Sequence, residues 1–397
     1  MKKLTYLFFT IPLLLISCIS PPVPDIEQVI QDADPNTIVP LSNQLTEGYF
    51  QTFLPIQSSP TRGLIHTYIG TIGDGVSVGS RADIEQLERS MHRIATDFFD
   101  PDEYFFRDGL ILQRDFVSRL LSPTDPDVED NIGLNPAIGT EVNFDGSMVA
   151  SGEERTSQIR PLSYVLEQNF GTIVDDEFQL EGVTIALAIN PHHTVIDRSV
   201  GAITPYRMSD EQIISTGQEM AAELLPLLRS EYSELRDVQI IFGLFILEAG
   251  NAVIPGRLAS LSVAHVGSSS LSSWTDVQER HFLLESPPNR EIIEYDVNIN
   301  DEFIFIRESI SRQFPHFYGI VGRVHFVNRD VYRVSIVFNM QFFGYSEKLS
   351  FHQMIGEYIQ KFSPEYDIRI VIRSTDEIHG AVTRLPHSEP VITWISW

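Results

Sequence analysis

Apolar residues recur at helical spacing in several separate segments of the chain. In residues 82–99 the apolar side chains fall on one face of a helix, and Asp100-Pro101 ends the segment. The same spacing predicts shorter helices at residues 113–121, 163–170 and 302–314. The chain is therefore predicted to contain several amphipathic helices that each bury one face.

Two further helices begin with a recognisable local signal. Ser209 and Gln212 form a capping box, in which each side chain accepts a hydrogen bond from the other residue's backbone N–H, and the pattern recurs at Ser350 and Gln353. Apolar residues flank both boxes in positions suited to a hydrophobic staple. Pro226 lies in the helix that opens at Ser209, and we expect it to kink or end that helix early because proline lacks a backbone donor.

Continuous or alternating apolar runs predict the strands. Residues 183–189 are apolar almost throughout, which is typical of a strand buried on both faces. Residues 320–327 and 331–342 flank Asn328-Arg329-Asp330 and predict a hairpin. Further strands are predicted at residues 238–247, 258–265 and 366–372.

The order strand, capped helix, strand occurs twice, which predicts an α+β fold made of two diverged repeat units. Each unit is expected to pack helices on a mostly antiparallel sheet. We place the first unit at residues 46–265, with its repeated core at about 160–265, and the second at residues 266–397. Coincidence is the alternative, since strand–helix–strand arrangements are common.

The N-terminus has the organisation of a lipoprotein signal. A basic start precedes an apolar run of about ten residues, too short to span a bilayer, and Ser17 precedes Cys18, the only cysteine. We expect the Cys18 sulfur to accept a diacylglyceryl group, with palmitate or similar chains, and cleavage between Ser17 and Cys18 then to leave Cys18 as the new N-terminus. Residues 1–17 are then the signal peptide, and residues 18–45 are a proline-rich linker that holds the body outside the cell membrane. An ordinary secretory signal or an uncleaved anchor is the alternative.

Composition narrows the choice of partners. The chain has 54 acidic and 28 basic residues and a net charge of −26, which argues against binding to nucleic acid or to anionic lipid through a basic patch. One cysteine excludes an intrachain disulfide, so the fold depends on its core. We expect the membrane, through the lipid on Cys18, and an extracellular ligand or protein as partners.

Catalytic patterns are weak. Ser77 lies in a Gly-x-Ser-x-Gly pattern, which in a nucleophile elbow follows a strand of a parallel sheet, but few folded residues precede it. A glycine-rich loop before a helix is the simpler interpretation. The acidic residues at positions 97–108 could include a glycosidase pair, or be solvated at a helix end. An extracellular hydrolase that uses Ser77 or such a pair is the alternative to a non-enzymatic protein.

Binding residues are equally sparse. Arg62, beside Gly63, could present its guanidinium to an anionic ligand or pair with an acid of the chain. Trp274 could be an exposed anchor or part of the core. His192-His193 and the acidic residues at positions 125–130 lack the spacing of a metal site, and we expect surface loops there. No cofactor or metal is predicted.

Short motifs in a fixed order, spread over residues 48–383, give the chain a resemblance to a known family. They are Tyr49-Phe50-Gln51-Thr52-Phe53-Leu54-Pro55, Arg62-Gly63-Leu64, Asn131-Ile132-Gly133-Leu134-Asn135-Pro136, Leu166-Glu167-Gln168, Gly182-Val183-Thr184-Ile185-Ala186-Leu187-Ala188, Gln218-Glu219-Met220-Ala221, Pro255-Gly256, Trp274, Val321-Gly322-Arg323-Val324-His325-Phe326-Val327 and Phe343-Gly344-Tyr345. In this order they resemble the CamS family, sex pheromone precursor lipoproteins of Gram-positive bacteria.

The resemblance implies a lipoprotein whose signal peptide yields a secreted heptapeptide pheromone, here residues 11–17. The other interpretation is that these residues serve only as the apolar part of the signal. The resemblance supplies no catalytic residues. The signal, the charge and the motifs together favour a membrane-anchored surface protein that acts as a binding or interaction module.

Overall fold

The computed structural model describes residues 39–40, 49–54, 58–62, 64, 72–73, 76–77, 81–137, 140–142, 148–150, 159–175, 177–197, 202–285, 287, 289–314 and 317–395. The signal peptide, Cys18 and Gly63 lie outside these residues. The described part divides its strands mainly between two six-stranded sheets, each with its own hydrophobic core. This arrangement confirms the predicted α+β class.

The first sheet has the strand order β14-β13-β12-β9-β8-β5. Its strands are β5 (Phe105–Asp108), β8 (Leu162–Val174), β9 (Glu177–Ile189), β12 (Gln239–Ile246), β13 (Arg257–Ala264) and β14 (Thr275–Asp276). All neighbouring strands are antiparallel except β9 and β12. Residues 182–189 of β9 are all buried, as their apolar sequence predicts.

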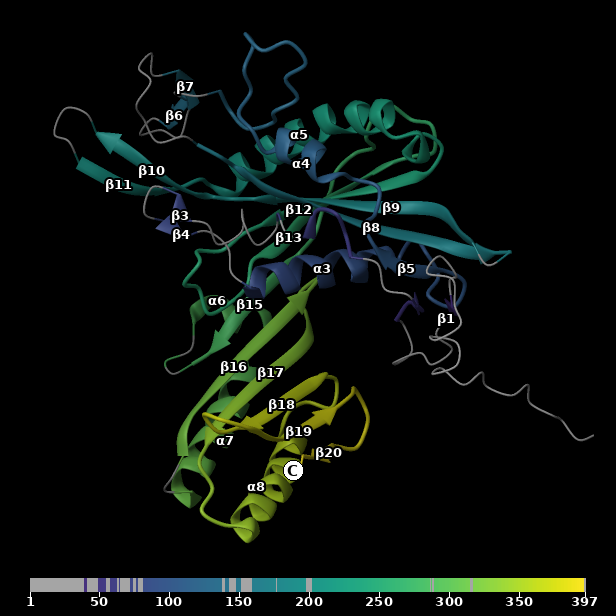
Figure 1. Ribbon diagram of the computed structural model, residues 1–397. Coiled ribbons are helices and arrows are strands. Elements are labelled where there is room, and N and C mark those ends of the chain that lie inside the picture. The colour runs from purple at the N-terminus through teal and green to yellow at the C-terminus, as the bar shows by residue number, and fades with distance from the viewer. Residues whose placement is uncertain are drawn as a thin grey trace, which may run out of the picture.

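Helices cover both faces of the first sheet (Figure 1). Helix α3 (Arg81–Ala95) lies on the face toward the second sheet, whereas α5 (Asp210–Glu231) and α4 (Arg114–Leu120) lie on the other face. Helix α3 approaches the sheet closely because Gly243 of β12 has no side chain: a Cβ there would lie 2.4 Å from Sδ of Met91. Coverage on both faces explains why the central strands are apolar almost throughout.

The second sheet has the strand order β15-β16-β17-β18-β19-β20. Its strands are β15 (Glu279–Leu284), β16 (Phe317–Val327), β17 (Asp330–Met340), β18 (Ile368–Arg373), β19 (Ile378–Arg384) and β20 (Val391–Trp394). Only β17 and β18 are parallel. Asn328 and Arg329 have φ of 53° and 72° in the tight turn between β16 and β17, so the predicted hairpin is confirmed.

One face of the second sheet carries most of its core. Buried and partly exposed residues alternate along β17 and β18, as expected of strands covered on a single face. Helices α7 (Ile299–Gln313) and α8 (Tyr345–Tyr358) supply their apolar faces to this core. Because burial alternates, the opposite face presents polar and half-buried side chains.

Both sheets contain the same run of connections. A hairpin (β8–β9 or β16–β17) is followed by a helix (α5 or α8), a parallel strand (β12 or β18) and an antiparallel strand (β13 or β19). This is the order on which the predicted repeat rests. Descent of the two units from one ancestral repeat, and the exact unit boundaries, stay predictions.

The remaining elements are short. They are β1 (Val39–Pro40), β2 (Phe53–Leu54), β3 (Ile72–Gly73), β4 (Val76–Ser77), β6 (Thr140–Val142), β7 (Met148–Ala150), β10 (His192–Asp197), β11 (Ala202–Arg207), α6 (Arg290–Tyr295) and the 3-10 helices η1 (Ser233–Leu235) and η2 (Ile359–Lys361). The small strands pair as four separate two-stranded ribbons. Within the described residues, every helix is too short or too polar to cross a bilayer.

Three local predictions are wrong. Residues 163–170 form part of strand β8 instead of a helix. In the sequence, Glu167 and Gln168 look like the polar face of a helix. In the structure they are buried, and they make hydrogen bonds to the backbone of Ile111 and of Glu88. Of the two outcomes predicted for Pro226, an early end of α5 is wrong, because the helix continues to Glu231 while its apolar face stays buried against the sheet. Ser350 lies inside α8, which begins earlier, after Gly344.

Candidate functional site

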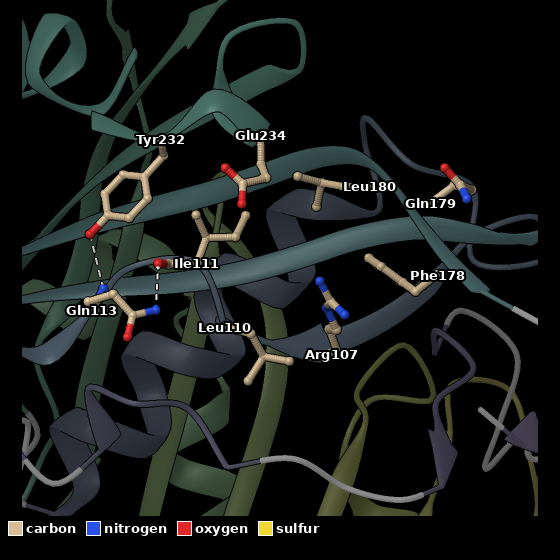
Figure 2. Close-up of a pocket in the computed structure, with 9 residues that line it drawn as sticks. All are labelled: Arg107, Leu110, Ile111, Gln113, Phe178, Gln179, Leu180, Tyr232 and Glu234. Carbon is tan, nitrogen blue, oxygen red and sulfur yellow. Dashed lines mark hydrogen bonds between the residues drawn. The ribbon is translucent and has the colours of Figure 1, made fainter. Parts of the chain in front are cut away.

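A cavity of about 570 Å³ opens on the first sheet between β5, β9 and the end of α5 (Figure 2). Its lining consists of Arg107, Leu110, Ile111, Gln113, Phe178, Gln179, Leu180, Tyr232 and Glu234. Three chain segments that are far apart in sequence therefore meet there. The volume is in the range of small-molecule sites.

The loop between β5 and α4, which lines one side of the cavity, is held by a buried carboxylate. Glu167 of β8 is 3% exposed and accepts hydrogen bonds from the backbone N–H of Ile111 (3.0 Å) and Leu112 (2.8 Å). Gly109 lets the chain pass over it, since a Cβ at that position would lie 2.5 Å from Cβ of Glu167. Burial raises the pKa of Glu167, while the two N–H donors and Arg107 oppose this effect. The loop is thus fixed before any ligand arrives.

Arg107 is the cationic group of the cavity. Its guanidinium carbon lies 4.0 Å from the ring centre of Phe178, and Figure 2 shows the side chain projecting between Leu110 and Leu180. Burial lowers the pKa of Arg107, but an arginine remains charged at physiological pH. Its Nε is buried and has no hydrogen-bond partner among the described residues. A charged guanidinium at the wall of a cavity favours a carboxylate or another anionic group.

The opposite wall is formed by the segment that follows α5. The hydroxyl of Tyr232 accepts a hydrogen bond from the backbone N–H of Gln113 (3.1 Å), which joins this segment to the loop. Gln113 is held in turn by the carbonyl of Ile111 (3.1 Å). Glu234 adds an exposed carboxylate at the rim. The cavity therefore offers one positive and one negative group above an apolar wall.

The binding residues suggested by sequence lie elsewhere. Arg62 is exposed and pairs with Glu88, and Asp108 lies 3.9 Å from it. Gly63 is outside the described residues. Trp274 is partly buried against the first core. The structure does not bring Arg62 and Trp274 to the cavity, and a ligand-binding role for them stays a prediction.

The candidate catalytic residues do not form a recognisable arrangement. Ser77 lies in the two-residue strand β4, which pairs antiparallel with β3 outside the six-stranded sheets, whereas a nucleophile elbow follows a strand of a main sheet. Among the acids after α3, the carboxylate of Asp100 caps the backbone N–H of Asp102 (2.9 Å). This contact is typical of a turn.

The two histidines at positions 192 and 193 begin strand β10 instead of forming a surface loop. Their register partners are Arg207 and Tyr206 of β11, and His193 is only 7% exposed. Burial lowers the pKa of His193 to about 4, so its imidazole is neutral at physiological pH. The loop prediction was wrong because the strand pairing that buries them is not visible in the local sequence.

Within the described residues, one group of metal-ligating side chains converges, and sequence analysis missed it. Glu279, His281 and His325 place one ligand atom each within 4.8 Å of one another. Burial and the charge of His325 lower the pKa of His281 to about 3. Burial opposes ionisation of Glu279, but the hydrogen bond and charge of His325 and the charge of Arg93 prevail and hold its pKa at about 2. The carboxylate of Glu279 is therefore ionised, and the imidazole of His281 is neutral, at physiological pH.

Comparison with known proteins assigns the chain to a family. Residues 72–390 match the family model described as CamS sex pheromone cAM373 precursor. The chain belongs to the CamS family. The match covers most of the chain and confirms the resemblance inferred from its motifs. No curated protein matches this CamS-family chain.

Two solved structures share the CamS fold. The sex pheromone precursor from Lactobacillus salivarius subsp. salivarius is 16% identical, with a TM-score of 0.76 over 91% of this chain and 99% of that one. The C-terminal domain of the sex pheromone staph-cAM373 precursor from Staphylococcus aureus is 22% identical, with a TM-score of 0.63 over 80% of this chain and 97% of that one. At these identities the likeness concerns the fold. The CamS family is named for a pheromone precursor and not for an enzymatic activity.

Proposed function

We propose that this CamS-family protein is a lipid-anchored surface protein that binds a small zwitterionic ligand in the cavity beside Arg107. The observation that carries the binding proposal is the guanidinium of Arg107, which faces the cavity and has its buried Nε unpartnered among the described residues. A carboxylate in the cavity would pair with the charge of this guanidinium.

The charge of the protein limits the ligand further. With a net charge of −26, the molecule repels anions at a distance, so a ligand with a carboxylate alone is disfavoured. Glu234 at the rim offers a partner for an amino group. A free amino acid or a short peptide carries both groups, and its side chain would lie against Leu110 and Leu180. This combination supports a zwitterion over a simple acid.

Calorimetric titration of the full chain with free amino acids and dipeptides tests the binding proposal. Arg107→Gln removes the cation but keeps a side chain of similar length, and we expect it to weaken binding at least tenfold, consistent with about 1.5–3 kcal/mol for a charged hydrogen bond. Arg312→Gln, on the exposed side of α7, is the matched control and should bind as the wild type does. Equal binding by the Arg107 variant, or no binding of any member of the panel, would remove the basis of the proposal.

The anchoring proposal rests on Cys18. Its position after a short apolar run and Ser17 supports acylation of its thiol, and two or more acyl chains hold a protein stably on a membrane. Cells fed an alkyne analogue of palmitate should label the wild-type protein and a Ser17→Ala variant, and Cys18→Ser should abolish both the label and recovery in the membrane fraction. Labelling that persists in Cys18→Ser would contradict the proposal.

A second function concerns the signal peptide. The family description as a pheromone precursor supports release of residues 11–17 as a signalling peptide. A synthetic peptide of this sequence, applied at nanomolar concentration to responder cells, should elicit a pheromone response, and a scrambled peptide should not. If the native peptide elicits no response, residues 11–17 serve only as the apolar part of the signal peptide.

A further inference from the structure

Glu279, His281 and His325 meet where the two sheets join. Glu279 and His281 are two residues apart on β15 and so share one face of the strand, and His281 lies directly opposite His325 in the register of β15 and β16. The two imidazole rings are stacked, with their centres 4.2 Å apart. Nε2 of His325 lies 2.7 Å from Oε1 of Glu279. Two residues on one strand and one on its antiparallel neighbour thus bring one ligand atom each within 4.8 Å of one another.

The surroundings of Glu279 hold its carboxylate in place. Glu279 is fully buried, and its Oε2 accepts a hydrogen bond from the backbone N–H of Leu258 on β13 (2.7 Å). Helix α3 provides two more donors, Gln86 Nε2 at 3.0 Å and Ser90 Oγ at 3.0 Å from Oε1. These partners belong to the first sheet and its helix, whereas the imidazoles belong to the second. Partners of this kind orient a ligating carboxylate and raise its affinity for a metal.

As does His325, His281 contributes a buried nitrogen without a well-formed hydrogen bond to the group. Its Nε2 is buried and has no hydrogen-bond partner among the described residues. A buried polar atom without a partner is costly, and a bound cation would satisfy it. Since His281 belongs to the group that includes Glu279 and His325, its unsatisfied atom points to a ligand and not only to an irregular core.

We propose that Glu279, His281 and His325 bind a divalent transition-metal ion, and that Zn²⁺ is the ion that suits them best. Two imidazoles and one carboxylate form a set of ligands that zinc sites use, with a fourth position left for water. Calcium and magnesium prefer oxygen ligands only, so the two histidines exclude them.

Modest movement is enough to admit the ion. Zinc–nitrogen and zinc–oxygen bonds of about 2.0–2.2 Å in a tetrahedron place ligand atoms about 3.3 Å apart. Nε2 of His325 and Oε1 of Glu279, now 2.7 Å apart, would therefore separate by roughly half an ångström as zinc replaces the proton between them. Arg93 also pairs with this carboxylate, with its Nη2 3.9 Å from Oε1, and its side chain must shift for a cation to enter.

The competing interpretation is a metal-free, hydrogen-bonded pair of Glu279 and His325 that only joins the two sheets. Cobalt distinguishes the two without any change to Glu279, His281 or His325, because Co²⁺ bound by four ligands in a tetrahedron absorbs strongly in the visible range. The full chain with Cys18→Ser, which removes the only thiol, should take up one Co²⁺ with such a spectrum and release it to one equivalent of Zn²⁺. Absence of this spectrum at micromolar protein and metal would overturn the proposal.

Substitution of the two histidines tests whether the ion binds at this group. His281→Ala and His325→Ala should each weaken zinc binding by more than tenfold in competition with a chromophoric chelator. The exposed His387 serves as the control, and His387→Ala should bind zinc as the parent chain does. Circular dichroism establishes that each variant is folded. Stoichiometric binding that survives both histidine substitutions would place the ion elsewhere and refute the assignment.

Discussion

Replacing Glu302 with glutamine should stabilise the protein at neutral and alkaline pH. Glu302 lies in the first turn of α7, and its Oε2 is buried without a hydrogen-bond partner among the described residues. Burial is the main cause that raises the pKa of Glu302, and the negative charge of Asp296 raises it further, to about 7. The backbone of Ser363 and the charge of Arg384 act in the opposite direction but do not prevail.

The size of the effect follows from the difference between the folded and unfolded states. The pKa of Glu302 changes from 4.5 to about 7, a difference of about 2.5, and each unit corresponds to about 1.4 kcal/mol, which gives about 3 kcal/mol. Partial exposure to water and the N-terminus of α7, which favours an anion, reduce this to about 2 kcal/mol.

The sign depends on which state holds the proton more tightly. The folded protein binds it more tightly, so ionisation costs nothing below about pH 4.5, costs progressively more up to about pH 7, and reaches its full value above that pH. Glutamine avoids this cost because it does not ionise. The benefit of Glu302→Gln should therefore grow as the pH rises through this window.

Urea unfolding at pH 4.5, 6 and 8 measures this dependence. The free energy of unfolding of Glu302→Gln should equal that of the wild type at pH 4.5 and exceed it by about 2 kcal/mol at pH 8. Glu308→Gln, on the exposed side of the same helix, should show no such trend. A difference that is constant with pH, or a variant less stable than wild type at pH 8, would refute the reasoning.

Three further substitutions test other parts of the fold by the same unfolding assay. Pro226→Ala should stabilise the protein by about 1–3 kcal/mol, because alanine restores a backbone donor inside α5, and destabilisation would show that the proline is needed there. Arg384→Met should destabilise it by about 3 kcal/mol, since Arg384 donates to the carbonyls of Ile359, Phe362 and Ser363, and a loss below 1 kcal/mol would count against this role. Asn135→Ala should cost about 3 kcal/mol because the buried amide bonds the carbonyls of Leu121 and Leu162 and the N–H of Leu162, and an unchanged midpoint would contradict this account.

Elements fixed by local interactions were predictable from sequence. The capping box of Ser209 and Gln212 is formed by both of its hydrogen bonds, 2.9 Å and 3.2 Å long, and Met208 and Ile213 are both buried beside it. Such interactions involve residues three to five positions apart, so the sequence contains all their partners. The same pattern at Ser350 failed because α8 begins after Gly344, where the carboxylate of Glu347 accepts a hydrogen bond from the backbone N–H of Phe343 (2.8 Å).

Elements whose hydrogen-bond partners are distant in the sequence could not be predicted from local patterns. Strand β8 carries Glu167, Gln168 and Asn169 in its buried centre, and a buried strand of this composition cannot be told from a helix by periodicity. The amide of Gln168 donates to the carbonyl of Glu88, eighty residues away. Only the completed sheet and α3 supply the partners that make burial of these polar groups acceptable.

The sequence by itself determined the α+β class, the CamS family, most helices and the central strands, because periodicity, caps and ordered motifs are local features of the chain. The tertiary structure alone decided both candidate sites. The cavity joins Arg107 to Phe178 and Tyr232, and the register of β15 against β16 sets His281 opposite His325, forty-four residues later. Spacing along the chain does not encode strand register between distant segments, so these groupings become visible only once the sheets have formed.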